Sequence, residues 1–597
     1  MRKPHYLTHN KANQIPSNCL WFDTETRATL DDEGNEHHHL DFGYAAFRRR
    51  KQGLHWCKPD WLRFTTIKQF WDFAESYCRD NVRLTLFAHN GQFDLPVLHA
   101  FTELPRRGWT LKSAIVDAPP MIITWKRGRE TIKFIDTLNI WRMSLAKIGE
   151  SIGLAKLTMP DLDAAKDDWN KYGKRDTEII MQACISWFDF IRKHDLGGFS
   201  PTLASQAFNA YRHRFMHENI FIDNKPEALE LTRGAFFGGR TECFKIGTYT
   251  GDFYHLDINS MYPFVMAEHQ YPVSLVGLYS RGTTRQLAKW LKQYAIVADV
   301  SLETDQPVYS MVHNGKLIFP VGRLRLKLSS PELRYALAHK HIKKIHLLAV
   351  YKQADLFSDF VTWGYRERQA ARADNNLIAV WYIKIFLNSL FGKWGQRGRH
   401  YENYGSTDSE EIKVWTQINA DTQEIKHFRQ FGGIIQHWQD EGEAFNSFPA
   451  IAAHITAYAR MALWGLMTQA GLKNVYYVDT DCVLVNKTGY NKLKGQIDAS
   501  RLGDLKLEGH YSRIELHGAK DYVFDQVRRV KGVRHNAKWI NDNTVEQVKF
   551  TGFRGLLRQG SLDAPIVSMQ RKVLRRVYDK GIVLKSGKVK PLRFDLW

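Results

Sequence analysis

Short apolar stretches with the length of β-strands recur along the chain, and the first pair lies near its start. Residues 20–25 ("LWFDTE") and 41–49 ("DFGYAAFRR") are mostly apolar, whereas residues 31–40 ("DDEGNEHHHL") between them are polar. This pattern predicts two strands joined by a polar hairpin tip. The tip contains three histidines (37–39), which we expect to be solvated, with metal binding as the alternative.

Two later apolar stretches carry aspartates at positions where a strand would be buried. Residues 253–263 ("FYHLDINSMYP") include Asp257, and residues 476–485 ("YYVDTDCVLV") include Asp479 and Asp481. Each stretch is predicted to be one strand. Because a buried carboxylate without a partner is costly, these aspartates require a neutralising group.

Helical periodicity is clearest on either side of the turn signal "DNN" at 374–376. In an antiparallel helical hairpin, Arg368 and Lys384 would both lie roughly 12 Å from the bend, and together they could grip one triphosphate. Lys384, Asn388 and Phe391 fall on one stripe of the second helix, where they offer a cation, an amide and a ring to a nucleotide. An amphipathic helix with an isolated lysine is the alternative.

The chain divides near residue 197, where glycine, proline and serine in "RKHDLGGFSPTLASQAF" interrupt the helical pattern. A length of 597 residues with 44% hydrophobic content suffices for several cores, so we expect at least two domains. Two later regions, at about 269–359 and 398–442, have a less regular pattern, and we expect both to be insertions.

Composition excludes several classes of protein. No run of 18 apolar residues exists, and no apolar segment follows the basic start, so we expect neither a membrane span nor a secretory signal. Six separated cysteines without a C-x-x-C pair argue against a zinc ribbon and a disulfide framework, and fit a reducing cytosol. A net charge of +21 with 13% aromatic residues suits nucleic acid, with a merely basic surface as the alternative.

Three segments of the N-terminal part present acidic groups from an apolar setting. Asp23 and Glu25 have the spacing that puts both carboxylates on one face of a strand. Asp94 stands at the end of an apolar strand, and Tyr172 and Asp176 share one face of a helix. Four converging carboxylates could hold two divalent ions about 4 Å apart and hydrolyse a phosphodiester.

The three aspartates of the later stretches suggest a second metal site. If Asp257 lies beside Asp479 and Asp481, two such charges 4 Å apart repel each other by roughly 4 kcal/mol at an effective dielectric of about 20. Two Mg²⁺ ions would remove this repulsion, polarise a 3′-hydroxyl and steady a leaving pyrophosphate. Mn²⁺ is also acceptable to a site made only of oxygen ligands.

The ordered motifs "DTE", "HNGQFD" and "Y-x-x-x-D" resemble those of the DEDDy class of 3′-5′ proofreading exonucleases. The resemblance implies a ribonuclease H-like fold with the catalytic residues Asp23, Glu25, Asp94, Tyr172 and Asp176, of which the tyrosine orients water and the acids bind metal. The residues implied to hold a single-stranded 3′ end are Thr26, Asn90 and Phe93. Lys147 matches an auxiliary lysine of such domains, with a solvated helix face as the alternative.

The segments "DINSMYP", "KIFLNSLFGKWG", "YVDTD" and "KDY" follow in this order and resemble motifs A, B, C and K-x-Y of family B DNA polymerases. The implied metal ligands are Asp257, Ile258, Asp479 and Asp481. The residues implied to contact the incoming nucleotide are Ser260, Met261, Tyr262, Arg368, Lys384, Asn388, Phe391 and Gly392. Tyr262 would act as the sugar gate, while Lys520 and Tyr522 would support the primer terminus.

The same resemblance covers nearly the whole chain and implies an α/β and α+β multidomain protein. A ribonuclease H-like exonuclease domain at 1–197 would precede a polymerase domain at 198–597. The expected parts of the latter are a palm at about 198–268 and 443–552, insertion 1 at about 269–359, fingers at about 360–397, insertion 2 at about 398–442 and a thumb at about 553–597.

The compact length and the two insertions point to the protein-primed subgroup found in phages and linear plasmids. The segment "AFFGGR" (235–240) resembles its Y-x-G-G motif, in which Phe236, Gly238 and Gly239 would approach a DNA strand closely. In that subgroup, insertion 1 contacts the priming protein and insertion 2 closes a ring around DNA, which would give processivity and strand displacement.

These resemblances imply a DNA-directed DNA polymerase that copies a linear genome from a terminal-protein primer. Its expected partners are template and primer DNA, dNTPs and the terminal protein, and we expect a monomer in the cytoplasm of a bacterial host. The alternatives are an enzyme that starts from an RNA or DNA primer or from none, and a nuclease or DNA-binding protein with an inactive synthesis site.

Three positions depart from the family pattern. Phe236 and Phe391 replace tyrosines, so the ring is kept and a hydroxyl is lost. We therefore expect stacking to survive and a hydrogen bond to DNA or sugar to weaken. Cys482 replaces a serine and is either a small packed side chain or an oxidisable thiol.

Overall fold

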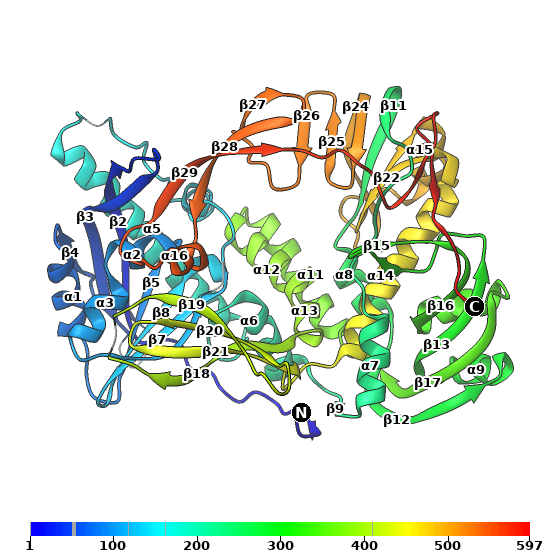
Figure 1. Cartoon of the computed structure of the whole chain (residues 1–597), viewed down its shortest axis with the longest axis horizontal. Coiled ribbons are helices and arrows are strands. Elements are labelled where there is room, and N and C mark those ends of the chain that lie inside the picture. Colours follow the sequence, from blue (N-terminus) through cyan, green and yellow to red (C-terminus); the bar gives the residue numbers. More distant parts are fainter. Residues whose placement is uncertain (1, 51–54, 117–118, 162, 409) are drawn as a thin grey trace.

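A ten-stranded mixed sheet organises the N-terminal part of the computed structural model, which describes residues 2–50, 55–116, 119–161, 163–408 and 410–597 (Figure 1). Its strands from this part are β2 (Asn18–Leu30), β3 (Glu36–Arg49), β4 (Asp60–Phe64), β5 (Arg83–Ala88), β6 (Thr110–Val116), β7 (Met121–Arg127) and β8 (Glu130–Asp136). Helices cover both faces: Phe22 contacts Phe70 of α1 (Ile67–Ser76), and Trp21 shares a core with α5 (Lys166–Lys193). Burial on both faces explains the apolar runs of the central strands.

A seven-stranded antiparallel sheet, the palm sheet, lies at the centre of the C-terminal part. Its strands in spatial order are β10 (Thr241–Cys243), β22 (Val475–Asp479), β23 (Cys482–Asn486), β11 (Gly247–Ile258), β24 (Leu505–Gly518), β25 (Asp521–Phe524) and β26 (Val527–Val530). The prediction of one strand over 476–485 was wrong, because β22 and β23 form a hairpin. Thr480 in its turn has a φ of 61°, so the two aspartates lie at a tight reversal and not inside a strand.

The predicted helical hairpin is confirmed as α11 (Ser358–Ala373) and α12 (Leu377–Ser389). Asn375 takes a positive φ of 55° at the bend, and the Asn376 side chain accepts the N–H of Ala379 at 3.1 Å. These two asparagines therefore reverse the chain and cap α12. Phe391 lies beyond α12, at the start of the short α13 (Phe391–Trp394), so the predicted stripe continues across a helix break.

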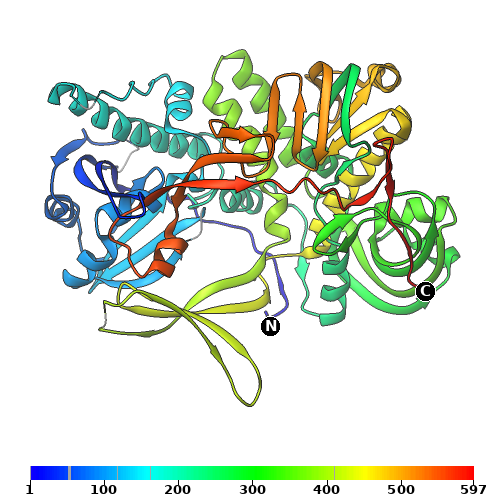
Figure 2. The ribbon, with the colours of Figure 1, turned by 45° about the horizontal axis from the view of Figure 1, so that its top comes forward.

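The two regions predicted to be irregular are sheets. The first forms β12 (Tyr271–Gly282), β13 (Ala295–Thr304), β16 (Val321–Ser329) and β17 (Ile342–Ala354), to which the C-terminal β32 (Arg593–Asp595) adds a fifth strand. The second forms a four-stranded antiparallel sheet of β18 (Arg397–Ser406), β19 (Lys413–Ile418), β20 (Ile425–Phe431) and β21 (Ile434–Glu443), which projects from the body in Figure 2. Much of this second sheet is exposed, so its strands lack the apolar alternation of a half-buried strand.

The chain after the palm sheet returns to the N-terminal sheet. The segments β27 (Lys538–Asn541), β28 (Thr544–Thr551), α16 (Phe553–Gln559) and β29 (Ile566–Val573) follow one another, and β29 pairs with β3 through Ile566 opposite His37 and Val567 opposite Glu36. The predicted boundary at 552 thus falls between two paired strands, β28 and β29. The histidines 37–39 belong to β3 and not to a hairpin tip, which spans only the residues between Leu30 and Glu36.

One hydrophobic core runs through both parts of the chain. It includes Trp21 and Trp187 from the N-terminal part together with Tyr382 of α12, and Tyr382 donates a hydrogen bond to Ala183 O at 3.3 Å. The six cysteines are all free thiols. Within the described residues, no helix combines the length and the apolar character needed to cross a membrane.

Candidate active sites

Three carboxylates converge at the edge of the N-terminal sheet. Asp23 and Glu25 lie on one face of β2, and Asp176 comes from α5. Their ligand atoms lie within 4.8 Å of one another, and no other trio of His, Cys, Asp or Glu in the described residues meets this criterion. Asp176 Oδ1 is buried without a hydrogen-bond partner. Oxygen donors grouped in this way fit a divalent cation.

Asp94 joins this group from a helix and not from the strand end that the sequence predicted. It lies in α2 (Gly91–Val97), accepts a hydrogen bond from Thr24 Oγ1 at 2.8 Å and is buried. The chain reaches α2 through Asn90 in a left-handed conformation, and Asp136 accepts the N–H groups of Asn90 and Gly91 at 3.1 and 3.0 Å. The left-handed Asn90 thus directs the first turn of α2, with Asp94, toward β2.

Burial makes these acids hard to ionise without a cation. Desolvation raises the pKa of Asp23 to about 6, and desolvation with the nearby Asp23 charge raises that of Glu25 to about 8. The pKa of Asp94 is raised well above its usual range by the same two causes. A dication among these groups would reverse the shifts, so the donor set fits a metal better than it fits bare carboxylates.

A lysine that the sequence did not single out lies in this site. Lys156 Nζ forms an ion pair with Asp176 Oδ2 and lies 4.3 Å from the ring centre of Tyr172. It also lowers the pKa values of Asp23 and Glu25 against the larger effect of burial. Lys147, the predicted auxiliary lysine, is exposed on α4 (Leu145–Ser151).

The residues predicted to hold a single-stranded 3′ end border the C-terminal strands. Thr26 Oγ1 lies 2.9 Å from Nδ1 of His38, whose ring packs 5.4 Å from that of Phe93. Phe93 in turn lies 6.1 Å from Phe550 of β28. A strand end entering the carboxylate site would therefore pass between the two parts of the chain.

A second acidic site lies where β11 meets the β22–β23 hairpin. Asp257 pairs with Cys482, and the N–H of Ile258 donates to Asp481 O at 2.7 Å, so Asp257 and Asp481 are neighbours. Burial, followed by the charge of Asp481, raises the pKa of Asp257 to about 7. Burial also raises the pKa of Asp481, and Lys384 lowers it. The oxygens of these two carboxylates form a site suited to a dication, and Lys384 lies close enough to act on both.

Asp479 differs from the other two aspartates because protein groups already satisfy it. It forms an ion pair with Lys520 at 3.2 Å and accepts hydrogen bonds from Thr241 Oγ1 at 2.9 Å and Tyr477 OH at 3.2 Å. Asp479 thus lies beside Asp481 with its carboxylate already held by protein groups, and its role as a metal ligand stays a prediction.

Comparison with known proteins agrees with this geometry. The family model of DNA polymerase type B, organellar and viral, matches residues 164–447. A "Probable DNA polymerase" of Neurospora intermedia is 23% identical over 452 residues, which cover 70% of this chain and 43% of the relative. The DNA-directed DNA polymerase of Enterobacteria phage PRD1 is 25% identical over 455 residues, or 73% of each chain. Over part of its length the chain is thus similar to DNA polymerases of type B.

The fold of the chain also matches a solved structure along most of its length. Phi29 DNA polymerase complexed with primer-template DNA and incoming nucleotide substrates gives a TM-score of 0.68 at 15% sequence identity. The match covers 94% of this chain and 100% of that chain. At this identity the likeness concerns the fold alone.

Some of the nucleotide-contact residues expected from the resemblance lie near the second acidic site, where Lys384 lowers the pKa values of Asp257 and Asp481. Arg368 is largely buried, and its Nη1 donates to Ser260 Oγ at 3.4 Å. Tyr262 and Phe391 stack with ring centres 4.3 Å apart. Asn388 donates to Lys384 O at 2.8 Å, and Gly392 is exposed.

Two of the expected contact residues are less available than the type B resemblance implied. Met261 is buried in the core, which leaves only its main chain for a nucleotide. Tyr522 stacks on Phe524 with ring centres 4.2 Å apart. Cys482 is also buried, in agreement with the packed alternative and not with a reactive thiol.

The two glycines of the type B segment "AFFGGR" have different surroundings. A Cβ on Gly239 would lie 2.6 Å from Cγ2 of Thr480, whereas a Cβ on Gly238 would have no heavy atom within 4 Å. Gly239 is thus required by the turn of the β22–β23 hairpin, and only Gly238 is open for the approach of another molecule. Phe236 packs against Gly395, the residue that follows α13.

Proposed function

We propose that the protein is a DNA-directed DNA polymerase whose synthesis site is built on Asp257 and Asp481. The hydrogen bond from the Ile258 N–H to the main-chain oxygen of Asp481 at 2.7 Å carries this proposal, because it holds the main chain of Asp257 beside that of Asp481, close enough for the Asp481 charge to raise the pKa of Asp257. Mg²⁺ ions held by these aspartates, with the main chain of Ile258, would activate a 3′-hydroxyl and stabilise a leaving pyrophosphate. The raised pKa of Asp257, about 7, supports a cation at this position.

The residues around these aspartates have distinct roles in the proposal. Lys384 and Arg368, both on the helical hairpin, bind the triphosphate. Lys384 lies near both aspartates, and Arg368 donates a hydrogen bond to Ser260. The ring of Tyr262, fixed by stacking on Phe391, occupies the space that a ribose 2′-hydroxyl would need. Lys520 holds Asp479 by an ion pair and lies beside the primer terminus.

Incorporation of dNTPs on a primed template with Mg²⁺ tests the synthesis site. Asp481→Asn should lower incorporation by at least a thousandfold, because it removes a metal ligand without a change in size. Asp252→Asn is the matched control, since Asp252 lies on β11, the strand that carries Asp257, pairs with His510 and Lys487, and is exposed. Equal incorporation by Asp481→Asn and wild type would refute the proposal.

We further propose that Asp23, Glu25, Asp94 and Asp176 form a 3′-5′ exonuclease site. Metal ions held by these four acids would supply a hydroxide and neutralise the scissile phosphate. Tyr172 is placed to orient the water, and Lys156, near both Asp176 and Tyr172, is placed to hold the phosphate. The grouping of Asp23, Glu25 and Asp176 within 4.8 Å supports this assignment.

Release of dNMP from a single-stranded oligonucleotide tests the exonuclease site. Asp176→Asn should abolish the release of dNMP. Asp163→Asn is the control and should leave release unchanged, because Asp163 precedes α5 and forms no salt bridge among the described residues. Undiminished release by Asp176→Asn would contradict the assignment.

We also propose that synthesis begins on a terminal protein. Support comes from the two inserted sheets and from similarity to polymerases of the phages PRD1 and Cp-1. Incubation with a candidate terminal protein and labelled dNTP should yield a protein-linked nucleotide. Extension of DNA or RNA primers without any such product would favour the alternative mode of initiation.

In this proposal the domains are those expected from the resemblance, with the strands β27–β29 grouped with the thumb. Insertion 2, the four-stranded sheet, would lie against the DNA and contribute to strand displacement. Deletion of residues 400–440 should shorten the products made on a primed circle. Unchanged product length would remove this role from the sheet.

A further inference from the structure

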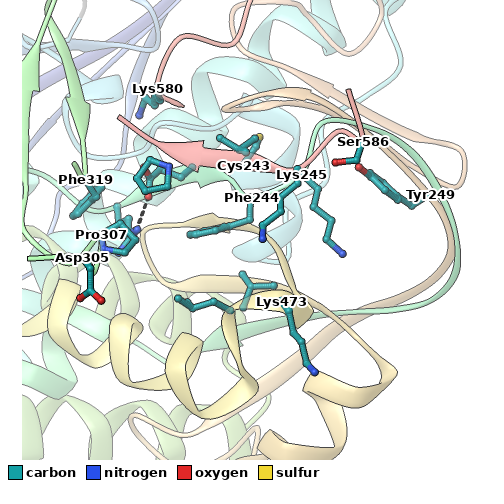
Figure 3. Close-up of a pocket in the computed structure, with 17 residues that line it drawn as sticks. Cys243, Phe244, Lys245, Tyr249, Asp305, Pro307, Phe319, Lys473, Lys580 and Ser586 are labelled. Carbon is teal, nitrogen blue, oxygen red and sulfur yellow. Dashed lines mark hydrogen bonds and ion pairs between the residues drawn. The ribbon is translucent and has the colours of Figure 1, made fainter. Parts of the chain in front are cut away.

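A cavity of about 530 Å³ lies behind β22, at the junction of four segments of the chain (Figure 3). Its walls come from β10 and the residues around it (240–245), insertion 1 (305–319), the start of β22 (472–475) and the C-terminal segment (580–591). A volume of this size suits one small molecule. None of the nucleotide-contact residues expected for the polymerase lines it.

Positive charge predominates around this cavity. The lining includes Arg240, Lys245, Lys473, Lys580 and Lys588. Arg240 neutralises Glu242, because its Nε donates to Glu242 Oε2 at 2.7 Å. Lys580 donates to Thr241 O at 2.8 Å. Across the described residues, Lys245, Lys473 and Lys588 form no salt bridge, although Lys245 Nζ lies 3.6 Å from the ring centre of Tyr476. Asp305 is the other acid in the lining, so cations still outnumber acids around the cavity.

The floor of the cavity is apolar and aromatic. It includes Phe244, Phe319 and Val475. The guanidinium of Arg240 stacks 4.0 Å above the ring of Phe319, and its Nη2 is buried without a hydrogen bond although it lies 2.6 Å from Glu242 Oε2. Figure 3 shows Lys245, Lys473 and Lys580 coming from three different segments around Phe244, with the nitrogen of Lys473 directed away from that ring. A bound molecule would therefore meet rings on one side and cations on another.

We propose that this cavity is a binding site for a nucleoside monophosphate. The phosphate would lie among Lys245, Lys473 and Lys588, and the base would lie against Phe244 and Phe319. A bare phosphate would leave the aromatic floor uncovered, and an uncharged nucleoside would leave the ammonium groups without a counter-charge. A compound with one ring system and one phosphate would contact both the aromatic side chains and the lysines of the cavity.

The site is separate from the synthesis site, although they share a strand. Thr241 and Glu242 are neighbours on β10, so their side chains point to opposite faces. Thr241 donates to Asp479, whereas Glu242 lines the cavity. Binding there requires no metal and neither Asp257 nor Asp481, so the inference stands independently of the proposed polymerase activity.

Equilibrium dialysis of radiolabelled dAMP against the full-length chain in EDTA tests this inference. We expect one dAMP per chain, with adenosine and inorganic phosphate each competing at least tenfold more weakly than dAMP. Lys245→Glu with Lys473→Glu should weaken dAMP binding by at least tenfold. Lys494→Glu, at an exposed lysine outside the cavity, and Lys384→Ala, in the synthesis site, should leave binding unchanged.

Three results would overturn the proposal. These are unchanged dAMP binding in the double variant, loss of binding in Lys384→Ala, and a (dA)₆ oligonucleotide that binds more than tenfold tighter than dAMP, which would assign the cavity to a strand end. Photo-crosslinking of wild-type protein with 8-azido-dAMP gives a check that needs no variant. The crosslink should fall in residues 240–249 or 472–475, and a crosslink confined to the acidic sites would count against the cavity.

Discussion

At the scale of residues, the lysine in the N-terminal site gives the first prediction. Lys156 contacts both Asp176 and Tyr172, so Lys156→Ala should slow 3′ trimming by roughly 10- to 100-fold, the range typical for groups that orient a metal site. Primer extension should stay within twofold of wild type. Trimming of a labelled single-stranded oligonucleotide measures the effect.

Lys147→Ala is the matched control for this prediction, because Lys147 is an exposed lysine on α4 in the same part of the chain. If Lys147→Ala slowed trimming and Lys156→Ala did not, the auxiliary lysine predicted from the sequence would be the right one.

The acids of both sites could be predicted from the sequence, whereas Lys156 could not. A carboxylate inside an apolar strand is conspicuous, because burial is costly without a cation, and Asp23, Asp257 and Asp481 stand in such settings. Lys156 lies in the segment "LAKLTMP", which has no helix or strand pattern that would single out its one lysine. Its significance comes from a contact with Asp176, 20 residues further along the chain, and only the tertiary fold supplies that contact.

A buried histidine gives a prediction about pH. His454 is fully buried, its Nδ1 donates to Ala450 O at 2.7 Å, and its Nε2 accepts the N–H of Ser330 at 3.4 Å, so the folded state requires the neutral ring. Burial lowers its pKa from 6.5 to about 4. Between these values the unfolded chain binds the proton and the folded chain does not. The free energy of unfolding therefore falls as the pH falls from about 6.5 to about 4, by roughly 3 kcal/mol for this group.

Urea denaturation of wild type and His454→Gln at several pH values isolates this contribution. The variant is less stable near neutral pH, and its deficit relative to wild type should shrink as the pH falls through the window. Parallel stability curves for the two proteins would show that His454 does not titrate in this way.

At the scale of elements, the β22–β23 hairpin depends on a glycine in the segment that leads into β10. A Cβ at position 239 would meet Thr480 at 2.6 Å, so Gly239→Ala should displace the turn that carries Asp479 and Asp481. Overpacking of this kind costs about 1–3 kcal/mol. We expect primer extension to fall by at least tenfold while 3′ trimming stays unchanged.

Gly238→Ala provides the control one residue away, because an added Cβ there meets nothing within 4 Å. Extension by this variant should match wild type within twofold. Equal loss of extension in both variants would point to a general intolerance of the segment and not to the contact with Thr480.

Prediction of elements succeeded where local signals were strong and failed where strands meet in space. The helical hairpin was predictable because Asp374–Asn376 are turn formers between two periodic segments. The β22–β23 hairpin was missed, since apolar residues flank both aspartates and no glycine or proline marks the turn at Thr480. The four-stranded sheet was missed because its exposed strands carry polar residues on both faces.

At the scale of the whole molecule, the two proposed sites share one core. Tyr382 of α12 packs against Trp187 of α5 with ring centres 4.7 Å apart, so the helix that carries Lys384 rests on the helix that carries Asp176. The sequence predicted a division near residue 197 but could not show this joint core, because its contacts join residues about 200 positions apart. A substitution of a catalytic side chain should therefore remove either extension or 3′ trimming, whereas a substitution in this shared core should impair both.

The pairing of β29 with β3 predicts how DNA is retained. Figure 1 shows β28 and β29 running from the side of the palm sheet to the N-terminal sheet. Glu36 and Val567 are directly paired across the two strands. Paired residues of antiparallel strands have Cα atoms about 5 Å apart, a separation that a disulfide can span. The double variant Glu36→Cys with Val567→Cys would be loaded on a primed circular template and then oxidised to form the disulfide. The oxidised protein should then stay bound to the circular DNA in high salt.

Retention of the closed circle is measured by gel filtration at high salt, with the reduced double variant as the control. Oxidation before addition of the circle should instead prevent loading. Identical retention of oxidised and reduced protein would mean that DNA does not pass beneath these strands.

The measurement that tests the account most directly compares extension and 3′ trimming of one primed template by two variants. Asp257→Asn should lose dNTP incorporation by at least a thousandfold and keep trimming, whereas Asp23→Ala with Glu25→Ala should lose trimming and keep incorporation. Loss of both activities in either variant, or of neither in both, would contradict the claim that two separate carboxylate sites, each filled by divalent ions, perform the chemistry of this protein.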